Sequence, residues 1–478
     1  MKLTILIFVA AIQTVTVAAQ TKPNIVYILA DDLGYGDLSC YGQKFFKTPI
    51  LDSLAHHGIR FTQHYTGSPV CAPSRASLMT GRDPGHSRVR GNYEVGPHGF
   101  GAGWPLLPED HTIAEVLKLG GYSTAIIGKW GLGIQETTGA PWMQGFDYSY
   151  GYLNQGHAHN QFPDHLFRNG NKEEILANKD GKTGAFSGDL LTHEAMQYLS
   201  KQKRDRPFFL YLAYVTPHAE LLVPDDSLFQ ACKGIVRDRP FTATKAGGTS
   251  NSYGGYRGQL YPAAAYAAMV VRLDRDIGKI VEKLKKNGLH DNTIIMFASD
   301  NGSHREGGAD PAYFASSGGL RGAKRDLYEG GIRTPFIVYW PGTVAAGSVS
   351  NHISGFWDIM PTVADIAGVN LKKNNVTTEG ISLLPTLKAQ IKDQKQHNYL
   401  YWEFHEGTTS HQAVRAGDWK AVRLDPHASM ELYNLKDDPA EKVDVASVHP
   451  QLASSMKATM DKAREPHKLW PLKGSVQK

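Results

Sequence analysis

Five short apolar runs, each followed by polar residues and a helix-like stretch, constrain the fold of this chain more than any other feature. They lie at residues 25–30, 123–127, 208–215, 293–298 and 335–339. Such runs are typical of parallel strands that are buried on both faces. Helix-like segments lie at residues 112–119, 193–199 and 263–286. The alternation predicts an α/β fold in which a large, mostly parallel central sheet is flanked by helices.

The pattern changes after Gly368. Residues 374–396 are polar and typical of a linker, and a terminal helix is predicted near residues 451–463. Short antiparallel strands are predicted at residues 398–404, 412–415 and 419–424. We therefore expect a catalytic α/β domain at residues 20–370 and a smaller α+β subdomain at residues 371–478.

Residues 1–19 have the features of a secretory signal peptide. Lys2 precedes an apolar core at residues 3–10, and small residues end the segment at Ala19. This pattern predicts cleavage after Ala19 and an exported protein, either periplasmic or secreted. A membrane anchor is not expected, because a spanning helix needs about 20 apolar residues and polar residues interrupt this run.

Composition and charge exclude several other classes of protein. Hydrophobic residues make up 41% of the chain and charged residues 20%, which is typical of globular proteins and not of disordered ones. The net charge of +5 is small for 478 residues and no block of basic residues occurs, so a nucleic-acid partner is not expected. Cys40, Cys71 and Cys232 are too few, and odd in number, for a disulfide framework.

Carboxylates follow two of the predicted strands directly. Asp31 and Asp32 come after the first strand, and Asp300 and Asn301 come after the fourth. In open α/β sheets ligands bind at the carboxyl ends of the strands, so these side chains are expected to meet. Their oxygens suit Ca²⁺ or Mg²⁺ rather than zinc. The alternative is that each aspartate only caps the helix that follows it.

Lys129 and His218 follow the second and third strands and are expected at the same edge. Between the first two strands, Cys71 opens a helix-like segment that contains Arg75. Taken alone, Cys71 is either a thiolate nucleophile of low pKa or a small buried apolar residue.

The segment Cys71-Ala72-Pro73-Ser74-Arg75 resembles the signature of the type I, formylglycine-dependent sulfatases, which belong to the alkaline phosphatase superfamily. The resemblance extends from Asn24 to the Asp438-Pro439 pair, and its motifs follow the order of the family. They are Ala30-Asp31-Asp32-Leu33-Gly34, Gly128-Lys129-Trp130, Thr216-Pro217-His218, Ser299-Asp300-Asn301-Gly302, Leu320-Arg321-Gly322-Ala323-Lys324 and Glu329-Gly330-Gly331. The resemblance implies an alkaline-phosphatase-like fold and hydrolysis of a sulfate ester.

The resemblance also implies roles for single residues. A maturation enzyme would oxidise Cys71 to formylglycine, and the hydrated aldehyde would attack sulfur. The implied metal is calcium, held by residue 71 together with Asp31, Asp32, Asp300 and Asn301.

The remaining implied roles concern the substrate. Lys129 and Lys324 would neutralise sulfate oxygens, His218 would protonate the leaving alcohol, and Arg75 would hold the hydrated aldehyde.

One departure from the family pattern affects the release of sulfate. Gly131 stands where many relatives carry a histidine that serves as the base for this step. We expect His159, or alternatively His157, to act as this base or as a sugar ligand.

A carbohydrate substrate is predicted from two polar segments, residues 85–92 and 151–165, which are rich in histidine and amide side chains. Arg90 and Asn92 in the first segment are predicted sugar ligands. Similar loops occur in sulfatases that act on polysaccharides, so a sulfated galactan is the first expectation and a glycosaminoglycan the second. Two other functions stay open here: a phosphate ester hydrolase of the same superfamily, and a binding protein for sulfated glycans without turnover.

Overall fold

The computed structural model describes residues 22–92, 95–96, 99–100, 103–243 and 256–475. The predicted signal peptide lies outside these residues. The strands of the main sheet are β1 (Asn24–Ala30), β2 (Ile59–Tyr65), β5 (Ser123–Lys129), β6 (Tyr148–Tyr152), β7 (His165–Arg168), β8 (Asn171–Glu174), β9 (Phe208–Ala213), β10 (Thr293–Ser299), β11 (Arg333–Tyr339), β12 (Ser348–Ser350) and β13 (Ser354–Gly355). A separate two-stranded pair consists of β3 (Val95–Gly96) and β4 (Gly99–Phe100).

The main sheet has a parallel centre and antiparallel edges. Its order is β12-β2-β11-β10-β1-β9-β5-β6-β7-β8, with β13 also paired to β2. The five strands from β10 to β6 in this order run parallel to one another. The predicted mostly parallel α/β sheet is therefore confirmed, and the carboxyl ends of β10, β1, β9 and β5 lie side by side.

The prediction that the run at residues 335–339 forms a parallel strand is wrong. This run lies in β11, which pairs with β10 in antiparallel orientation. An apolar run reports burial on both faces but not direction. The connection between β10 and β11 returns to the same edge of the sheet, so residues 300–332 stay beside the carboxyl end of β1. β2 was not predicted, because polar side chains interrupt its apolar pattern.

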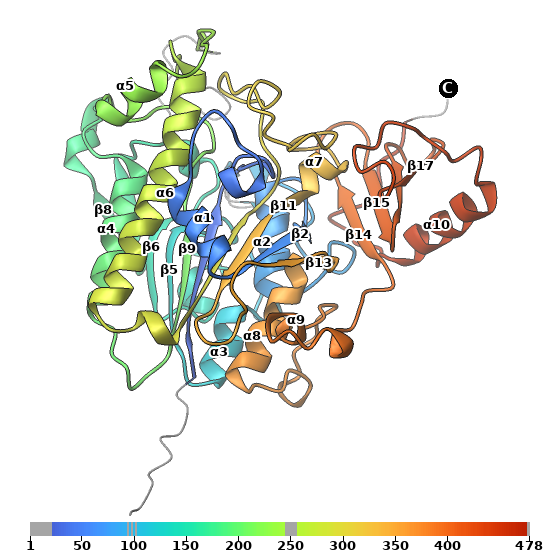
Figure 1. The fold of residues 1–478 in the computed structure, drawn as a ribbon, viewed down its shortest axis with the longest axis horizontal. Helices are drawn as coiled ribbons and strands as arrows, with labels where there is room; N and C mark the ends of the chain where they lie inside the picture. The colour runs from blue at the N-terminus through green and yellow to red at the C-terminus, as the bar shows by residue number, and fades with distance from the viewer. Residues whose placement is uncertain (1–21, 93–94, 97–98, 101–102, 244–255, 476–478) are drawn as a thin grey trace, which may run out of the picture.

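Helices cover both faces of the main sheet (Figure 1). They are α1 (Pro49–His56), α2 (Cys71–Thr80), α3 (Ile113–Leu119), α4 (Ser187–Ser200), α5 (Ser227–Lys233), α6 (Pro262–Lys286), α7 (Glu329–Ile332), α8 (Ile359–Ala367) and α9 (Leu384–Leu387). Alternate residues of β1 pack against different helices: Val26 and Ile28 belong to the core with α1, α4, α5 and α6. Ile25 and Tyr27 belong to the core with α2, α3, α8 and α9.

The predicted helices are confirmed with shifts at their ends, the largest in α4, which begins at Ser187 rather than at residue 193. A capping box of Thr112 and Glu115 begins α3, which explains why the helix starts at Ile113. The long helix α6 ends before Asn287 and Gly288, and Gly288 adopts a positive φ of 65°, as expected of a helix stop. None of the described helices is both long and apolar enough to cross a membrane. All three cysteines are free.

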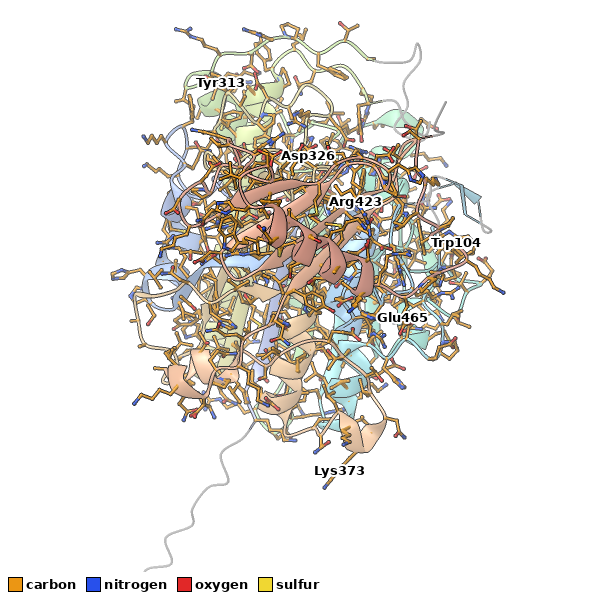
Figure 2. The ribbon with its side chains drawn as sticks, turned by 90° about the vertical axis from the view of Figure 1, so that its right-hand side faces the viewer. Trp104, Tyr313, Asp326, Lys373, Arg423 and Glu465 are labelled. Carbon is orange, nitrogen blue, oxygen red and sulfur yellow. The ribbon has the colours of Figure 1, made fainter. Side chains whose placement is uncertain are left out.

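The predicted small antiparallel sheet and terminal helix are also confirmed. The sheet contains β14 (Leu400–Phe404), β15 (His411–Ala416), β16 (Trp419–Arg423) and β17 (Glu431–Asn434), and the helix is α10 (Pro450–Lys462). One face of this sheet packs on α10, and Trp402 on the other face packs on Tyr65 and Trp357 of the main part. Figure 2 views the molecule from this side, with Arg423 on the small sheet in front.

Residues 374–396 are more structured than a linker. Leu383 and Leu387 are buried against the core with α2, α3 and α8. The division of the chain after residue 370 therefore stays a prediction, because the residues that follow it pack on the main core.

A buried ion cluster ties the small sheet to the main part. Lys420 Nζ in β16 lies 3.0 Å from Glu329 Oε1 and 2.8 Å from Glu441 Oε1, and all three side chains are fully buried. Removing the lysine would leave Glu441 without its cation and facing Glu329, which among the described residues would keep only Arg333, at 3.3 Å, as an ion-pair partner. We therefore expect Lys420→Met to lower the free energy of unfolding by about 3–5 kcal/mol, measured by urea denaturation.

The matched control for this prediction is Lys457→Met. Lys457 is 57% exposed and pairs with Asp461 on the surface of α10 at 2.6 Å. Its replacement should change the free energy of unfolding by less than about 1 kcal/mol. Equal effects of the two substitutions would show that the buried cluster does not stabilise the fold.

Candidate functional site

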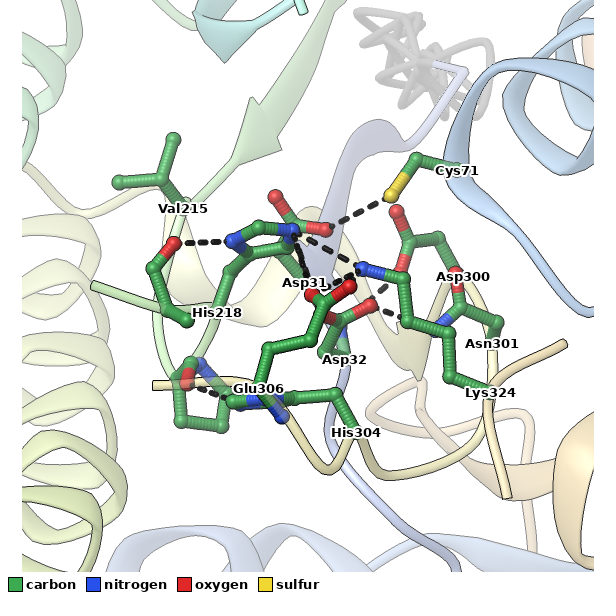
Figure 3. Close-up of polar contacts among 12 residues, drawn as sticks. Asp31, Asp32, Cys71, Val215, His218, Asp300, Asn301, His304, Glu306 and Lys324 are labelled. Atoms are coloured by element: carbon green, nitrogen blue, oxygen red, sulfur yellow. Dashed lines mark hydrogen bonds and ion pairs between the residues drawn. The ribbon is translucent and has the colours of Figure 1, made fainter. Parts of the chain in front are cut away.

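Three aspartates and one asparagine meet at the carboxyl ends of β1 and β10 (Figure 3). The backbone N–H of Asp32 donates to Asp300 Oδ1 at 3.1 Å, and Asn301 Nδ2 donates to Asp32 Oδ1 at 2.7 Å. Asp31, Asp32, Asp300 and Asn301 are all fully buried. The structure thus brings together the four residues that the sequence suggested as metal ligands.

Two lysines approach these carboxylates from different parts of the chain. Lys129 at the end of β5 lies 2.7 Å from Asp31 Oδ2, and Lys324 from the β10–β11 connection lies 2.8 Å from Asp32 Oδ2. Both ammonium groups are buried, and a buried positive charge is stable only when it is paired with a negative group. Two buried cations therefore lie beside these aspartates, where they can neutralise a bound anionic group.

Helix α2 brings Cys71 and Arg75 to the same place. Cys71 is the first residue of the helix, and its Sγ donates to Asp31 Oδ1 at 3.3 Å. One turn later, Arg75 Nε donates to Asp300 Oδ2 at 2.9 Å and Nη1 donates to the carbonyl of Lys129 at 2.9 Å. Arg75 thereby connects α2 to the ends of β5 and β10.

The donor set fits a hard cation. Asn301 Oδ1 is buried and has no hydrogen-bond partner among the described residues, so an acceptor there is left for a metal. Ligand atoms of Asp31, Asp32, Cys71 and His218 lie within 4.8 Å of one another. Carboxylate and amide oxygens of this kind suit Ca²⁺.

The charged groups shift one another's pKa values. Burial alone would raise the pKa of Asp31, but Lys129, His218 and Arg75 together hold it well below its ordinary value. Burial and the neighbouring Asp31 raise the pKa of Asp300 to about 7. Burial and Asp31 also raise the pKa of the Cys71 thiol well above its ordinary value. A thiol of raised pKa is a poor nucleophile, which argues against unmodified Cys71 in that role.

His218 lies beside Lys324 with a defined tautomer. Its Nδ1 donates to the carbonyl of Ala219, so Nε2 is the nitrogen that faces the pocket. Nε2 lies 3.0 Å from Lys324 Nζ and 3.3 Å from Asp32 Oδ2. Burial and the charge of Lys324 lower the pKa of His218 well below its ordinary value.

The two histidines of the 3₁₀ turn His157–His159 lie in different surroundings. His159 is partly exposed and stacks on His218, with ring centroids 4.4 Å apart. His157 instead stacks on His165 at 4.3 Å and groups with Asp164. The structure therefore places His159, and not His157, beside the site.

Gly131 occupies a position where a side chain does not fit. Its φ is 75°, in the left-handed region, and a Cβ there would lie 2.1 Å from Gln155 Nε2. Gln155 is buried and fills the space beside Gly131.

Arg90 and Asn92, which the sequence suggested as sugar ligands, both make contacts within the chain, and sugar binding by them stays a prediction. Arg90 is buried and pairs with Glu403 of the small sheet at 3.0 Å. Asn92 Oδ1 accepts a hydrogen bond from the backbone N–H of Ala72 at 2.9 Å. Arg90 therefore joins the two parts of the chain, and Asn92 holds the start of α2 beside Cys71.

Comparison with known proteins agrees with this geometry. A family model described as Sulfatase matches residues 23–369, and one described as N-sulphoglucosamine sulphohydrolase, C-terminal, matches residues 322–466. The chain belongs to the sulfatase family.

Known relatives of this sulfatase match most of its length. It is 34% identical to an arylsulfatase of Hemicentrotus pulcherrimus, with 88% of this chain and 71% of the relative covered. It is 31% identical to an N-acetylgalactosamine-6-sulfatase of Mus musculus, with 94% and 81% covered. A crystal structure of Ps i-CgsB in complex with k-i-k-neocarrahexaose is 30% identical, with a TM-score of 0.74 and 95% and 96% covered.

These matches identify the sulfatase as a sulfuric ester hydrolase. They favour this activity over the phosphate ester hydrolase and the binding protein that the sequence left open.

The sequence did not point to one acidic residue of the sulfatase site. Glu306 Oε2 lies 3.1 Å from Lys324 Nζ and 3.9 Å from His218 Nε2. The only signal was its position shortly after the Asp300–Asn301 pair, next to His304. His304 itself donates to the carbonyl of Pro217 at 3.0 Å and its ring lies parallel to that of His218.

Proposed function

We propose that this protein is an exported sulfatase that removes sulfate from a sugar and that uses formylglycine, formed from Cys71, and Ca²⁺. The observation that carries the proposal is one buried cluster in which Cys71 donates to Asp31 and Arg75 donates to Asp300. In the same cluster Lys129 pairs with Asp31 and Lys324 pairs with Asp32. A maturation enzyme that oxidises Cys71 is the partner that this proposal requires.

The proposed metal ligands are Asp31, Asp32, Asp300 and Asn301, together with residue 71. When bound, Ca²⁺ supplies a positive charge that polarises sulfate oxygens, and formylglycine supplies a hydroxyl nucleophile through its hydrate.

The other residues of the pocket orient the reacting groups. Lys129 and Lys324 bind the sulfate oxygens, because their ammonium groups line the pocket beside Cys71 and Asp32. Arg75 holds residue 71 in place through its contacts with Asp300 and the carbonyl of Lys129. His218 passes a proton through Nε2 to the leaving alcohol. Because Nδ1 carries the N–H that donates to the backbone, Nε2 first takes this proton from the ammonium group of Lys324, which lies 3.0 Å away.

His159 is the proposed base for the release of sulfate. It is partly exposed, it stacks on His218, and Gly131 offers no side chain for this task. Burial, then the charges of His218 and Lys129, lower the pKa of His159 well below its ordinary value, so the ring is neutral.

The proposed substrate is a sulfated galactan or a related glycan built from galactose or N-acetylgalactosamine. The relatives support this class, since one is an N-acetylgalactosamine-6-sulfatase and another binds a neocarrahexaose. The test is a panel of galactose and N-acetylgalactosamine sulfates, with free sulfate measured by ion chromatography. The protein used must have its modified residue 71 verified by mass spectrometry.

The role of His218 predicts a dependence on the leaving group. We expect His218→Gln to lower kcat for a sulfated sugar by about 10²–10⁴-fold, because a sugar alcohol needs a proton to leave. The loss should be much smaller with 4-nitrophenyl sulfate, whose leaving group is stable as an anion. Steady-state kinetics with both substrates check this. Equal losses on the two substrates would show that His218 does not act as the acid.

A further inference from the structure

Three charged side chains from two segments form a chain of ion pairs beside Lys324 and His218. Arg325 Nη1 lies 2.6 Å from Glu306 Oε1, and Arg325 Nε lies 3.2 Å from Glu406 Oε2. Glu306 and Arg325 belong to the β10–β11 connection, and Glu406 follows β14 of the small sheet. We call Glu306, Arg325 and Glu406 the rim triad.

The rim triad lies beside the groups that surround the scissile ester. Glu306 contacts both Lys324 and His218, the residue proposed to protonate the leaving alcohol. The backbone N–H of Arg325 donates to the carbonyl of Pro69 at 2.9 Å, two residues before Cys71. The alcohol part of a bound ester must therefore lie close to the triad.

The triad is accessible to a ligand. The side chain of Arg325 is 46% exposed, that of Glu306 is 19% exposed and that of Glu406 is 23% exposed. The carboxylates of Glu306 and Glu406 are thus partly exposed and can accept hydrogen bonds from sugar hydroxyl groups.

The charge of the triad disfavours a second anion. One arginine is shared by two carboxylates, so the triad has a net charge of −1. The nearby cations Arg75, Lys129 and Lys324 are paired with Asp300, Asp31 and Asp32. Among the described residues, a second sulfate beside the triad would meet the carboxylate oxygens of Glu306 and Glu406, while Arg325 is already paired with both, which costs binding free energy.

We propose that the rim triad binds hydroxyl groups of the sugar ring that carries the ester, and that it selects rings with one sulfate over rings with two. The inference rests on the proposed function and deepens it by naming the substrate class: a glycan unit that is neutral beside the scissile ester. The triad would select the ring with one sulfate partly because its carboxylates repel the second sulfate of a disulfated ring.

The test compares two kinds of probe. The first set is galactose 2-, 4- and 6-sulfate, and it shows which sulfate ester the protein hydrolyses fastest. The second set is the galactose disulfates that carry this same ester together with a second sulfate on the ring. We expect kcat/KM for the best monosulfate to exceed that for its disulfates by at least about tenfold. Glu406→Gln should narrow this ratio, because it removes one negative charge. Arg325→Met should widen the ratio, because it removes the cation of the triad.

The matched control is Arg305→Met. Arg305 lies in the same connection, is 61% exposed and pairs with Asp326 at 3.4 Å rather than with a member of the triad. Its replacement should leave the ratio unchanged. If Arg325→Met does not fold, as judged by thermal melting, Glu406→Gln decides the outcome alone. Equal rates for monosulfates and disulfates, or a ratio unmoved by Glu406→Gln, would overturn the inference.

Failure of the proposed function gives a different result. In that case no galactose sulfate and no 4-nitrophenyl sulfate is hydrolysed by protein with verified modification of Cys71. The binding of the same probes to Cys71→Ser protein, measured by calorimetry, then tests the triad without turnover. A monosulfate that binds more tightly than its disulfates supports the inference, and equal binding overturns it.

Discussion

Cys71→Ala is expected to lower the rate of sulfate release by at least about 10⁴-fold, since removal of a nucleophile has effects of this size in other hydrolases. The proposed nucleophile derives from this side chain, and alanine cannot be converted to it. The measurement is free sulfate released from 4-nitrophenyl sulfate or a galactose sulfate. The variant should still fold, because the thiol makes one weak hydrogen bond, to Asp31.

The matched control is Cys232→Ala. Cys232 is also buried and free, but it lies in α5 and packs in the core with α6. Its replacement should leave the rate close to that of the unchanged protein. Sulfate release that persists in Cys71→Ala at the original rate would rule out the proposed nucleophile.

The second large effect concerns the metal. Asp300→Ala is expected to weaken Ca²⁺ binding by more than about 100-fold, because even outer partners of metal ligands contribute about 10–100-fold. Activity should fall with it, since Asp300 also holds Arg75 at 2.9 Å. Calorimetry with Ca²⁺ measures the binding directly, and addition of a chelator to the unchanged protein should abolish activity reversibly.

Asp37→Asn serves as the control for the metal prediction. Asp37 is fully buried, but it accepts hydrogen bonds from Gly34 and Tyr266 and lies outside the proposed ligand set. Asparagine retains an acceptor oxygen, so Ca²⁺ affinity should change little. If both substitutions weakened Ca²⁺ binding equally, the metal would lie elsewhere.

The sequence predicted the site residues that lie at or directly after the carboxyl ends of strands. Asp31, Lys129, His218 and Asp300 each follow an apolar run within a few residues, and parallel neighbours place their carboxyl ends together. Cys71 was predictable for a different reason, because its motif is specific. Local sequence was therefore sufficient for residues held by the parallel centre of the sheet.

Other features depended on contacts between distant segments. Glu406 reaches the pocket from the small sheet, and no pattern near it indicates this position. His157 and His159 are two residues apart, yet one faces His165 and the other His218. The antiparallel direction of β11 follows from how its connection returns, which the apolar run does not record.

The central claim is that modified Cys71 provides the activity, and one measurement tests it most directly. Samples with different degrees of modification are prepared by varying the level of a formylglycine-generating enzyme during expression. Mass spectrometry gives the modified fraction of residue 71, and the initial rate of sulfate release is measured for each sample. We predict a rate proportional to the modified fraction, with no activity at zero modification. A rate that is independent of this fraction would contradict the account.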